Sequence, residues 1–329
     1  MQAKIVFEYL LKRSLQNIET SKTVGHISKD KILNILLSVS LQLPDIFLLN
    51  KKLDIRWSGK FAFDGTFFKI SGKLFVLLLC SDFESLDVIN YMIAPLENYH
   101  YWKKFLEKIN YELSKNGIAK FYVTDGKKGL HQALFELYPN VPTQLCTTHK
   151  QRRINQIIPQ IYGDGYDKLF SHLAHQAIKA PIKEIYQFYL DILVDFNYSK
   201  EFLTYPDSRK QKLKKIIGAL RFQKLKLHTR YYSQEKITDP TTNHLEGINS
   251  FLKERIGLMR GFKKLDNTEL LIKLLIYYYR FHEFTSSSFK ERNGKCPIEL
   301  NSINNQKYLT KIISKKTPSS WIKNLLSCP

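Results

Sequence analysis

The spacing of apolar residues predicts that the chain starts with helices. Residues 8–18 (EYLLKRSLQNI) and 28–43 (SKDKILNILLSVSLQL) place apolar side chains three and four positions apart, which is the period of a helix with one buried face. Ser28 stands where a residue that caps a helix N-terminus is expected. Two short helices joined by residues 19–26 fit a helix-turn-helix that reads DNA, although any small helical pair has the same pattern. Both interpretations stay open.

From residue 60 the pattern changes to the period of strands. Residues 60–70 (KFAFDGTFFKI) alternate between apolar and polar, and residues 73–83 (KLFVLLLCSDF) form an apolar run typical of a buried strand. Residues 87–96 (DVINYMIAPL) are a third candidate strand. Because only the short turn at Ser71 and Gly72 separates the first two, we predict an antiparallel meander.

After the meander, helical and strand patterns alternate. Such an order predicts an α/β fold, in which a mixed five-stranded sheet is flanked by helices. The predicted elements are a helix over 101–117, a strand over 119–126, a helix over 127–139, a strand over 141–149 and a helix over 150–158.

Residues 160–235 contain no strand pattern, and their amphipathic stretches predict an all-α insertion. A helix beginning near Asn243 and a longer one over 266–284 follow. We therefore predict five segments. They are a helical N-terminal region (1–56), the first part of the sheet-containing core (57–158), the helical insertion (159–236), the second part of the core (237–300) and a basic C-terminal tail (301–329).

The charge balance of the chain is strongly basic. Lys and Arg number 51 against 30 Asp and Glu, a formal net charge of +21. Such an excess indicates a polyanionic partner, most often nucleic acid, but a solvated basic surface would show the same balance. The longest apolar run, residues 74–80, is too short to cross a bilayer, so no membrane partner is expected.

Cysteine usage and the N-terminal stretch indicate the compartment. Four cysteines at irregular distances (Cys80, Cys146, Cys296 and Cys328) do not form a disulfide framework. Charged residues interrupt the first apolar stretch, so no signal-peptide core is expected. We expect a cytoplasmic protein with reduced thiols.

Two aspartates are the first candidates for chemistry. Asp64 lies inside a predicted strand and Asp125 ends another. A carboxylate among apolar residues must be hydrated, paired or bound to a cation, because burying a lone charge is costly. The alternatives are a bulge at Asp64-Gly65 and a simple Asp-Gly turn at Asp125. If the two strands lie side by side, a third carboxylate from a helix would complete a site for Mg²⁺ or Mn²⁺.

The third candidate acid is Glu246, in the stretch DPTTNHLEGINSFLKERIG over residues 239–257. With Asn243 as the N-cap of a helix, Glu246 falls at the third helical position, which predicts a reciprocal capping box. An acid in the first turn also interacts favourably with the helix dipole. The local pattern alone therefore favours capping over catalysis.

These stretches together resemble a known family. FDGTF around Asp64, VTDGKKGLHQALFELYPNVPTQLCTTHKQRRI from Asp125 onward and TTNHLEGINSFLKER around Glu246 resemble the DDE transposases with an RNase H-like core. The chain is most similar to bacterial insertion-sequence enzymes related to the Mutator transposases, over roughly residues 58–300. The resemblance implies that Asp64, Asp125 and Glu246 bind two Mg²⁺ or Mn²⁺ ions. Glu246 then has a catalytic role, with capping as its local geometry.

The resemblance also brings a Cys-x-x-His signature, at Cys146 and His149. We expect these two residues, like Asn243, to be structural or to line the active site. The alternative is a zinc site that includes His172 and His175, but two ligands from the signature are too few for one. Basic residues near the motifs are candidate DNA contacts, or else a solvated face. They are Arg152, Arg153, Lys253, Arg255, Arg260, Lys263 and Lys264.

The resemblance implies a DNA transposase that cleaves the ends of an insertion element and joins them to target DNA. Its partners would be double-stranded element ends and target DNA, with a homodimer or larger assembly forming on DNA in the nucleoid. Two other functions stay open, namely an RNase H-like nuclease that does not join ends and a non-catalytic DNA-binding protein derived from a transposase. The helical insertion departs from many relatives because it lacks tryptophan, and Tyr231 and Tyr232 are candidates for its aromatic role.

Overall fold

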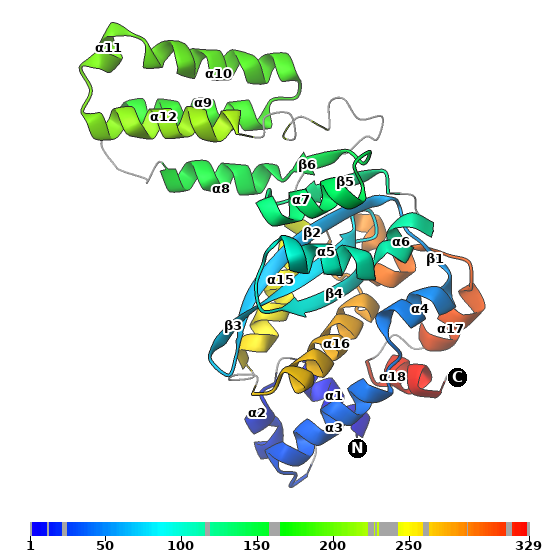
Figure 1. Ribbon diagram of the computed structural model, residues 1–329. Coiled ribbons are helices and arrows are strands. Elements are labelled where there is room, and N and C mark those ends of the chain that lie inside the picture. Colours follow the sequence, from blue (N-terminus) through cyan, green and yellow to red (C-terminus); the bar gives the residue numbers. More distant parts are fainter. Residues whose placement is uncertain are drawn as a thin grey trace. The chain divides into compact units, whose positions relative to one another are not determined.

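The computed structural model describes most of the chain and divides it into two compact units (Figure 1). Unit 1 comprises Met1–Ala119, Lys128–Pro139 and His244–Pro329, and unit 2 comprises Lys120–Lys127 and Asn140–Asn243. The structure describes residues 2–11, 13–21, 25–115, 119–157, 165–222, 227, 229, 243–258, 263–287, 289–313 and 318–327.

The predicted mixed five-stranded sheet with flanking helices is confirmed. Its strand order is β4-β3-β2-β5-β6. The predicted meander is antiparallel throughout, with Asp64 of β2 opposite Leu79 of β3. β5 and β6 are parallel, as expected for strands connected through a helix. The strands are β2 Lys60–Ile70, β3 Lys73–Asp82, β4 Val88–Ala94, β5 Phe121–Thr124 and β6 Thr143–Leu145.

Helices cover both faces of the meander in unit 1. Phe63 of β2 meets Trp102 of α5 edge-to-face, with ring centroids 6.4 Å apart. The next residue, Asp64, accepts a hydrogen bond from Asn249 of α15. Because successive strand residues point to opposite faces, α5 and α15 lie on opposite sides of β2 (Figure 1). The helices of this region are α5 Tyr99–Lys108, α6 Asn110–Lys115, α7 Lys128–Leu137, α15 Asn243–Leu258 and α16 Leu265–Phe281.

The N-terminal region is helical as predicted, but its first helix is interrupted. One helix was predicted over residues 8–18, whereas α1 ends at Leu10 and α2 begins at Leu15. The cause is Ser14, which takes an extended backbone and caps α2 by accepting from the Asn17 N–H. The predicted cap at Ser28 is confirmed. These helices are α1 Gln2–Leu10, α2 Leu15–Thr20, α3 Lys29–Gln42 and α4 Ile46–Leu53.

Two further predicted elements differ from the structure. The helix predicted over 101–117 breaks at Ile109, between α5 and α6. The strand predicted over 141–149 ends at Leu145, because the Cys146 carbonyl already accepts from the Lys150 N–H and α8 begins at Thr147. The C-terminal residues of unit 1 are folded, with Trp321 buried and stacked on Phe281. They form η1 Lys290–Arg292, η2 Pro297–Leu300, β7 Ser302–Ile303 (paired with β1 Ile55–Arg56), α17 Gln306–Ile313 and α18 Pro318–Ser327.

Unit 2 encloses a core of its own. Buried apolar residues of the helices after β6 pack together, including Phe170, Leu190 and Ile216. Lys150 is buried on α8 and donates to the Phe222 carbonyl at 2.8 Å, and burial lowers the pKa of this lysine to about 8. The helices are α8 Thr147–Ile157, α9 Gly165–Lys179, α10 Lys183–Asn197, α11 Lys200–Leu203 and α12 Asp207–Arg221.

No single helix among the described residues combines the length and the apolar character that a membrane crossing requires. The pair α3 and α4, bent by 43° at the break between them, meets both criteria only when the two helices are taken together.

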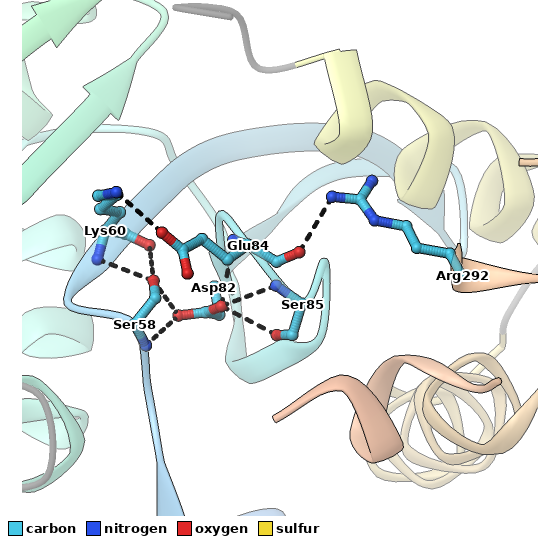
Figure 2. A network of polar contacts seen from close by, with 6 residues as sticks. All are labelled: Ser58, Lys60, Asp82, Glu84, Ser85 and Arg292. Atoms are coloured by element: carbon cyan, nitrogen blue, oxygen red, sulfur yellow. Dashed lines mark hydrogen bonds and ion pairs between the residues drawn. The ribbon is translucent and has the colours of Figure 1, made fainter. Parts of the chain in front are cut away.

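Two buried carboxylates fasten the end of β3. Asp82 accepts hydrogen bonds from the backbone and hydroxyl groups of Ser58 and Ser85, in the network shown in Figure 2. In the same network Glu84 pairs with Lys60 at 2.8 Å and accepts from Arg292 through its carbonyl. Burial raises the pKa of the Asp82 carboxyl, and the hydrogen bonds from Ser58 and Ser85 oppose part of that rise.

Asp87 forms the second of these structural sites. Its carboxylate is fully buried and receives two hydrogen bonds of 2.8 Å from Arg280 on α16. Asn301, just after η2, donates a third at 2.8 Å. Residues 294–300 (GKCPIEL) therefore lead directly to Asn301, which connects the C-terminal residues to the meander.

The close approach of two helix N-termini in unit 1 requires glycine. A Cβ at Gly129 in α7 would lie 2.6 Å from the Tyr99 backbone nitrogen and 2.8 Å from the Asn98 carbonyl carbon. Backbone atoms cannot move aside as a flexible side chain can, so Gly129→Ala is expected to destabilise unit 1 by about 1–3 kcal/mol. Chemical denaturation would measure this. Gly247→Ala is the control, because a Cβ at Gly247 in α15 meets nothing within 4 Å. A Gly129→Ala protein as stable as this control would contradict the packing argument.

Glu112 makes the stability of unit 1 depend on pH. Burial raises the pKa of this α6 carboxyl from 4.5 to about 7, Asp45 adds to the rise, and Asn50 and Lys108 oppose it. A folded-state pKa above the unfolded value gives stability that is complete below pH 4.5 and is lost as the pH rises through 7. Glu112→Gln should therefore stabilise the protein at pH 8 by up to about 3 kcal/mol and leave it unchanged near pH 4.

Urea denaturation at the two pH values tests this expectation. Glu107→Gln removes an exposed carboxylate nearby on α5 and serves as the control. An equal effect of Glu112→Gln at both pH values would show that the carboxyl does not titrate as described.

Candidate active site

Asp64 is held from two sides within unit 1. The residue lies in the middle of β2 and is 8% exposed. Its Oδ1 accepts from the Gly65 N–H at 2.9 Å, and its Oδ2 accepts from Asn249 Nδ2 at 2.7 Å. Both bonds favour the ionised carboxylate, which is otherwise costly to bury. The regular β2–β3 register through this position excludes the bulge considered from the sequence.

Glu246 lies on the helix that contacts Asp64. It is half-buried in the first turn of α15, three positions before Asn249. Residues three apart on a helix share a face, so Glu246 is directed to the same side of α15 as the residue that binds Asp64. Asp64 and Glu246, which are 182 positions apart in the chain, thus both belong to the contact between β2 and α15.

The capping box predicted at Asn243 stays a prediction. The helix α15 is described from Asn243 onward, and Glu246 is its fourth residue. The side chain of Asn243 lies outside the described part of the structure.

Asp125 belongs to unit 2, where it directly follows β5. Its Oδ1 accepts from the Lys127 N–H at 3.0 Å, and Gly126 has a φ of +91°, so the Asp-Gly turn is formed as the sequence suggested. Next to it, the Cys146 N–H donates to the Thr124 carbonyl at 2.7 Å. The buried Cys146 thereby joins the ends of β5 and β6, while His149 is half-buried in the first turn of α8.

One predicted DNA contact, Arg255, has a structural position instead. Its side chain is buried, donates through Nε and Nη2 to the Leu10 carbonyl, and lies 3.6 Å above the Phe251 ring. A guanidinium that caps the last turn of α1 and stacks on an aromatic ring is not available to DNA phosphates. The prediction for Arg255 is therefore corrected: the residue fastens α15 to α1.

The other basic candidates are placed as follows. Arg152 and Arg153 are exposed on α8 of unit 2. In unit 1, Lys253 is exposed on α15, and Lys263 and Lys264 are exposed just before α16. Arg260, Tyr231 and Tyr232 lie outside the described residues.

The side chains around Asp64 bear on whether this site could hold a metal ion. Within the described residues, no group of three or more His, Cys, Asp and Glu side chains is arranged to hold an ion. Beside the Asp64 carboxylate, however, Asn249 Oδ1 is buried and has no hydrogen-bond partner. Carboxylate and amide oxygens are the hard ligands that Mg²⁺ and Mn²⁺ prefer, so the chemistry of these residues fits such an ion.

Comparison with known proteins identifies the family. The family model described as "Transposase, Mutator family" matches residues 84–283, more than half of the chain. The chain belongs to the Mutator family of transposases. The matched region of this Mutator-family chain contains Asp125, the Cys-x-x-His signature and Glu246, and Asp64 precedes it.

Two curated insertion-sequence proteins are similar to parts of this Mutator-family chain. The transposase for insertion sequence element IS1201 of Lactobacillus helveticus is 26% identical over 136 residues, covering 35% of this chain and 36% of that protein. The transposase for insertion sequence element IS905 of Lactococcus lactis subsp. lactis (strain IL1403) is 26% identical over 169 residues, covering 48% of this chain and 42% of that protein. The chain thus spans less than half the length of either relative.

Asn249 is not among the candidate residues that the sequence pattern indicates. The available signal was its position three residues after Glu246 on a predicted amphipathic helix, which places it on the same face. Its partner, 185 positions earlier in the chain, could not be read from that spacing.

Proposed function

We propose that this Mutator-family chain is a DDE transposase with an RNase H-like core, which cleaves the DNA ends of an insertion element and joins them to target DNA. The observation that carries the proposal is the 2.7 Å hydrogen bond between Asn249 and Asp64. It fixes α15, the helix of Glu246, on the strand of Asp64, as a converging acidic site requires. Family membership and the net charge of +21 support DNA as the substrate.

In this proposal the three acids have distinct tasks. Asp64, Asp125 and Glu246 would together hold two Mg²⁺ or Mn²⁺ ions. Divalent ions bound in this way activate an attacking oxygen and stabilise the leaving oxygen of a phosphodiester. The buried, doubly hydrogen-bonded Asp64 supplies a negative charge in a fixed orientation, and the helix carries Glu246 to the same contact.

Basic side chains would bind the DNA backbone. Exposed candidates are Arg152 and Arg153 in unit 2 and Lys253, Lys263 and Lys264 in unit 1. Lysine and arginine contacts with phosphates position a duplex without reading its sequence. Because two element ends must be joined, we propose that a dimer or larger assembly forms on DNA.

The test is a reaction of the full chain with labelled duplexes carrying the terminal sequences that flank its gene, with a supercoiled target and Mg²⁺. The proposal expects cleaved ends and products in which those ends are joined to the target. Cleavage without joining would contradict the transposase proposal and indicate a nuclease instead. If the chain binds the ends equally well with and without metal and cleaves nothing, the result would indicate a non-catalytic DNA-binding protein derived from a transposase.

A further inference from the structure

We propose that Asn249 is the positioning residue of the acidic site: its amide N–H fixes the Asp64 carboxylate, and its buried, unpaired Oδ1 would be an additional hard-oxygen group for a divalent ion. The inference rests on the proposed function, since it assigns a role within that site. It adds to the three acids a neutral side chain without which Asp64 would be charged but not oriented.

The contact between Asn249 and Asp64 is short and largely shielded from solvent. Asn249 is 4% exposed and Asp64 is 8% exposed, and their side chains are joined at 2.7 Å. The other carboxylate oxygen accepts from Gly65 in the same strand. With a donor at each oxygen, rotation of the carboxylate would break a charge-assisted hydrogen bond in a place where water cannot replace it.

The position of Asn249 is set by the packing of α15. Leu245, Ile248 and Leu252 are buried on this helix and hold it against unit 1. Asn249 lies beside this apolar stripe, and Glu246 lies one turn earlier. The same packed helix therefore fixes both the group that orients Asp64 and the second acid, so that the two cannot shift independently.

The Oδ1 atom of Asn249 adds a second observation, which gains its meaning from the neighbouring Asp64 carboxylate, since the Oδ1 of Asn50 is also buried without a partner. Within the described part of the chain this atom is buried and has no donor. Leaving a buried acceptor without a partner costs about 1–3 kcal/mol, so such atoms call for an explanation. If the amide were turned around, Oδ1 would face the Asp64 oxygen, which is also an acceptor. Asp64 thus fixes the orientation of the amide. Asn249 Oδ1 remains an unpaired acceptor that is available to a ligand at the site.

The test measures metal binding apart from catalysis. The full chain and its Asn249→Ala variant are titrated with Mn²⁺ by calorimetry, and bound Mn²⁺ is followed by electron paramagnetic resonance. The affinity for Mn²⁺ is expected to fall by about tenfold or more, as is typical when a group that orients a metal ligand is removed. Asn249→Ser, which keeps a donor, is expected to retain part of the affinity and covers the case in which the alanine variant does not fold.

Asn50→Ala is the matched control. Asn50 is also a 4% exposed asparagine of unit 1, and its Nδ2 donates to the Ile89 carbonyl of β4 at 3.0 Å. Losing this bond should lower the melting temperature without changing Mn²⁺ affinity. Equal Mn²⁺ affinities for wild type, Asn249→Ala and Asn249→Ser would overturn the inference, because a merely structural asparagine behaves that way.

Asp64→Asn separates this inference from the proposed function. If Asp64→Asn loses Mn²⁺ affinity and Asn249→Ala does not, the acidic site stands and only the role of Asn249 is rejected. If Asp64→Asn binds Mn²⁺ as wild type does, the metal site itself is misplaced and both proposals fail. The expected result is that Asp64→Asn and Asn249→Ala both lose Mn²⁺ affinity, whereas Asn50→Ala keeps it.

Discussion

Asp64→Asn is expected to reduce cleavage of element ends by about 1,000-fold or more, because removing a metal-binding charge forfeits several kcal/mol of transition-state stabilisation. The fold should persist. An asparagine at position 64 can accept from the Gly65 N–H and donate to Asn249, whose amide can turn to offer its unpaired Oδ1. The measurement is the single-turnover rate of end cleavage in Mg²⁺, with the melting temperature recorded in parallel.

Two comparisons sharpen this expectation. Asp125→Asn and Glu246→Gln should each cause a loss of similar size, since groups that act as one unit are not additive. Glu254→Gln, an exposed acid two turns after Glu246 on the same helix, should leave the cleavage rate within a few-fold of wild type. An Asp64→Asn protein that cleaves normally would remove the site assignment, whatever its stability.

Arg280→Met should be the most destabilising of the substitutions considered, by about 3–5 kcal/mol, since it leaves one member of a buried ion pair uncompensated. Both side chains of the Arg280–Asp87 pair are fully buried. Burial raises the pKa of Asp87, and Arg280 opposes that rise. Without the arginine the pKa of Asp87 should rise further, so the loss of stability should be smaller at pH 5 than at pH 7. Denaturant unfolding at the two pH values measures both effects.

The matched control for this substitution is Arg292→Met. Arg292 donates to the Glu84 carbonyl at 3.1 Å at an exposed position, so its loss should cost less than about 1 kcal/mol. In the double variant Asp87→Asn/Arg280→Met, the buried charge is gone and Asn301 can still donate to position 87. This double variant should be more stable than Arg280→Met alone. If the double variant is less stable than Arg280→Met, then packing, and not the unpaired charge, determines the loss of stability.

The strands of the meander could be predicted well because their signals are local. Residues 60–70 alternate and end at a tight turn, and β2 has those bounds. Helix breaks were harder to foresee. The break after Leu10 depends on one serine cap, and the end of β6 depends on the Cys146 carbonyl, which accepts from the Lys150 N–H at the start of α8. Neither alters the apolar spacing from which the elements were predicted.

The sequence suggests a set of candidate acids for the site but not the contacts that these residues make. Asp64 could be proposed because a carboxylate among apolar residues is conspicuous in a sequence, whereas Glu246 was proposed only through the resemblance to the DDE transposases. The partners of Asn249 and Arg255 lie 185 and 245 positions away, respectively, and no local pattern reports on such distances. Arg255 was consequently mistaken for a surface base, although the aromatic residues Phe251 and Tyr278 enclose it.

The bonds that Asp87 receives also affect the order of events during synthesis. Arg280 and Asn301 follow it by 193 and 214 positions, respectively, so Asp87 leaves the ribosome long before either partner exists. Until then its carboxylate has to stay hydrated, which keeps this end of the meander from closing early. Contacts so distant in sequence slow the final folding step and leave apolar strands exposed in the nascent chain. Unit 1 should therefore reach its native state only after residue 301 has emerged, and chaperones that bind nascent chains should have their longest contact with the meander.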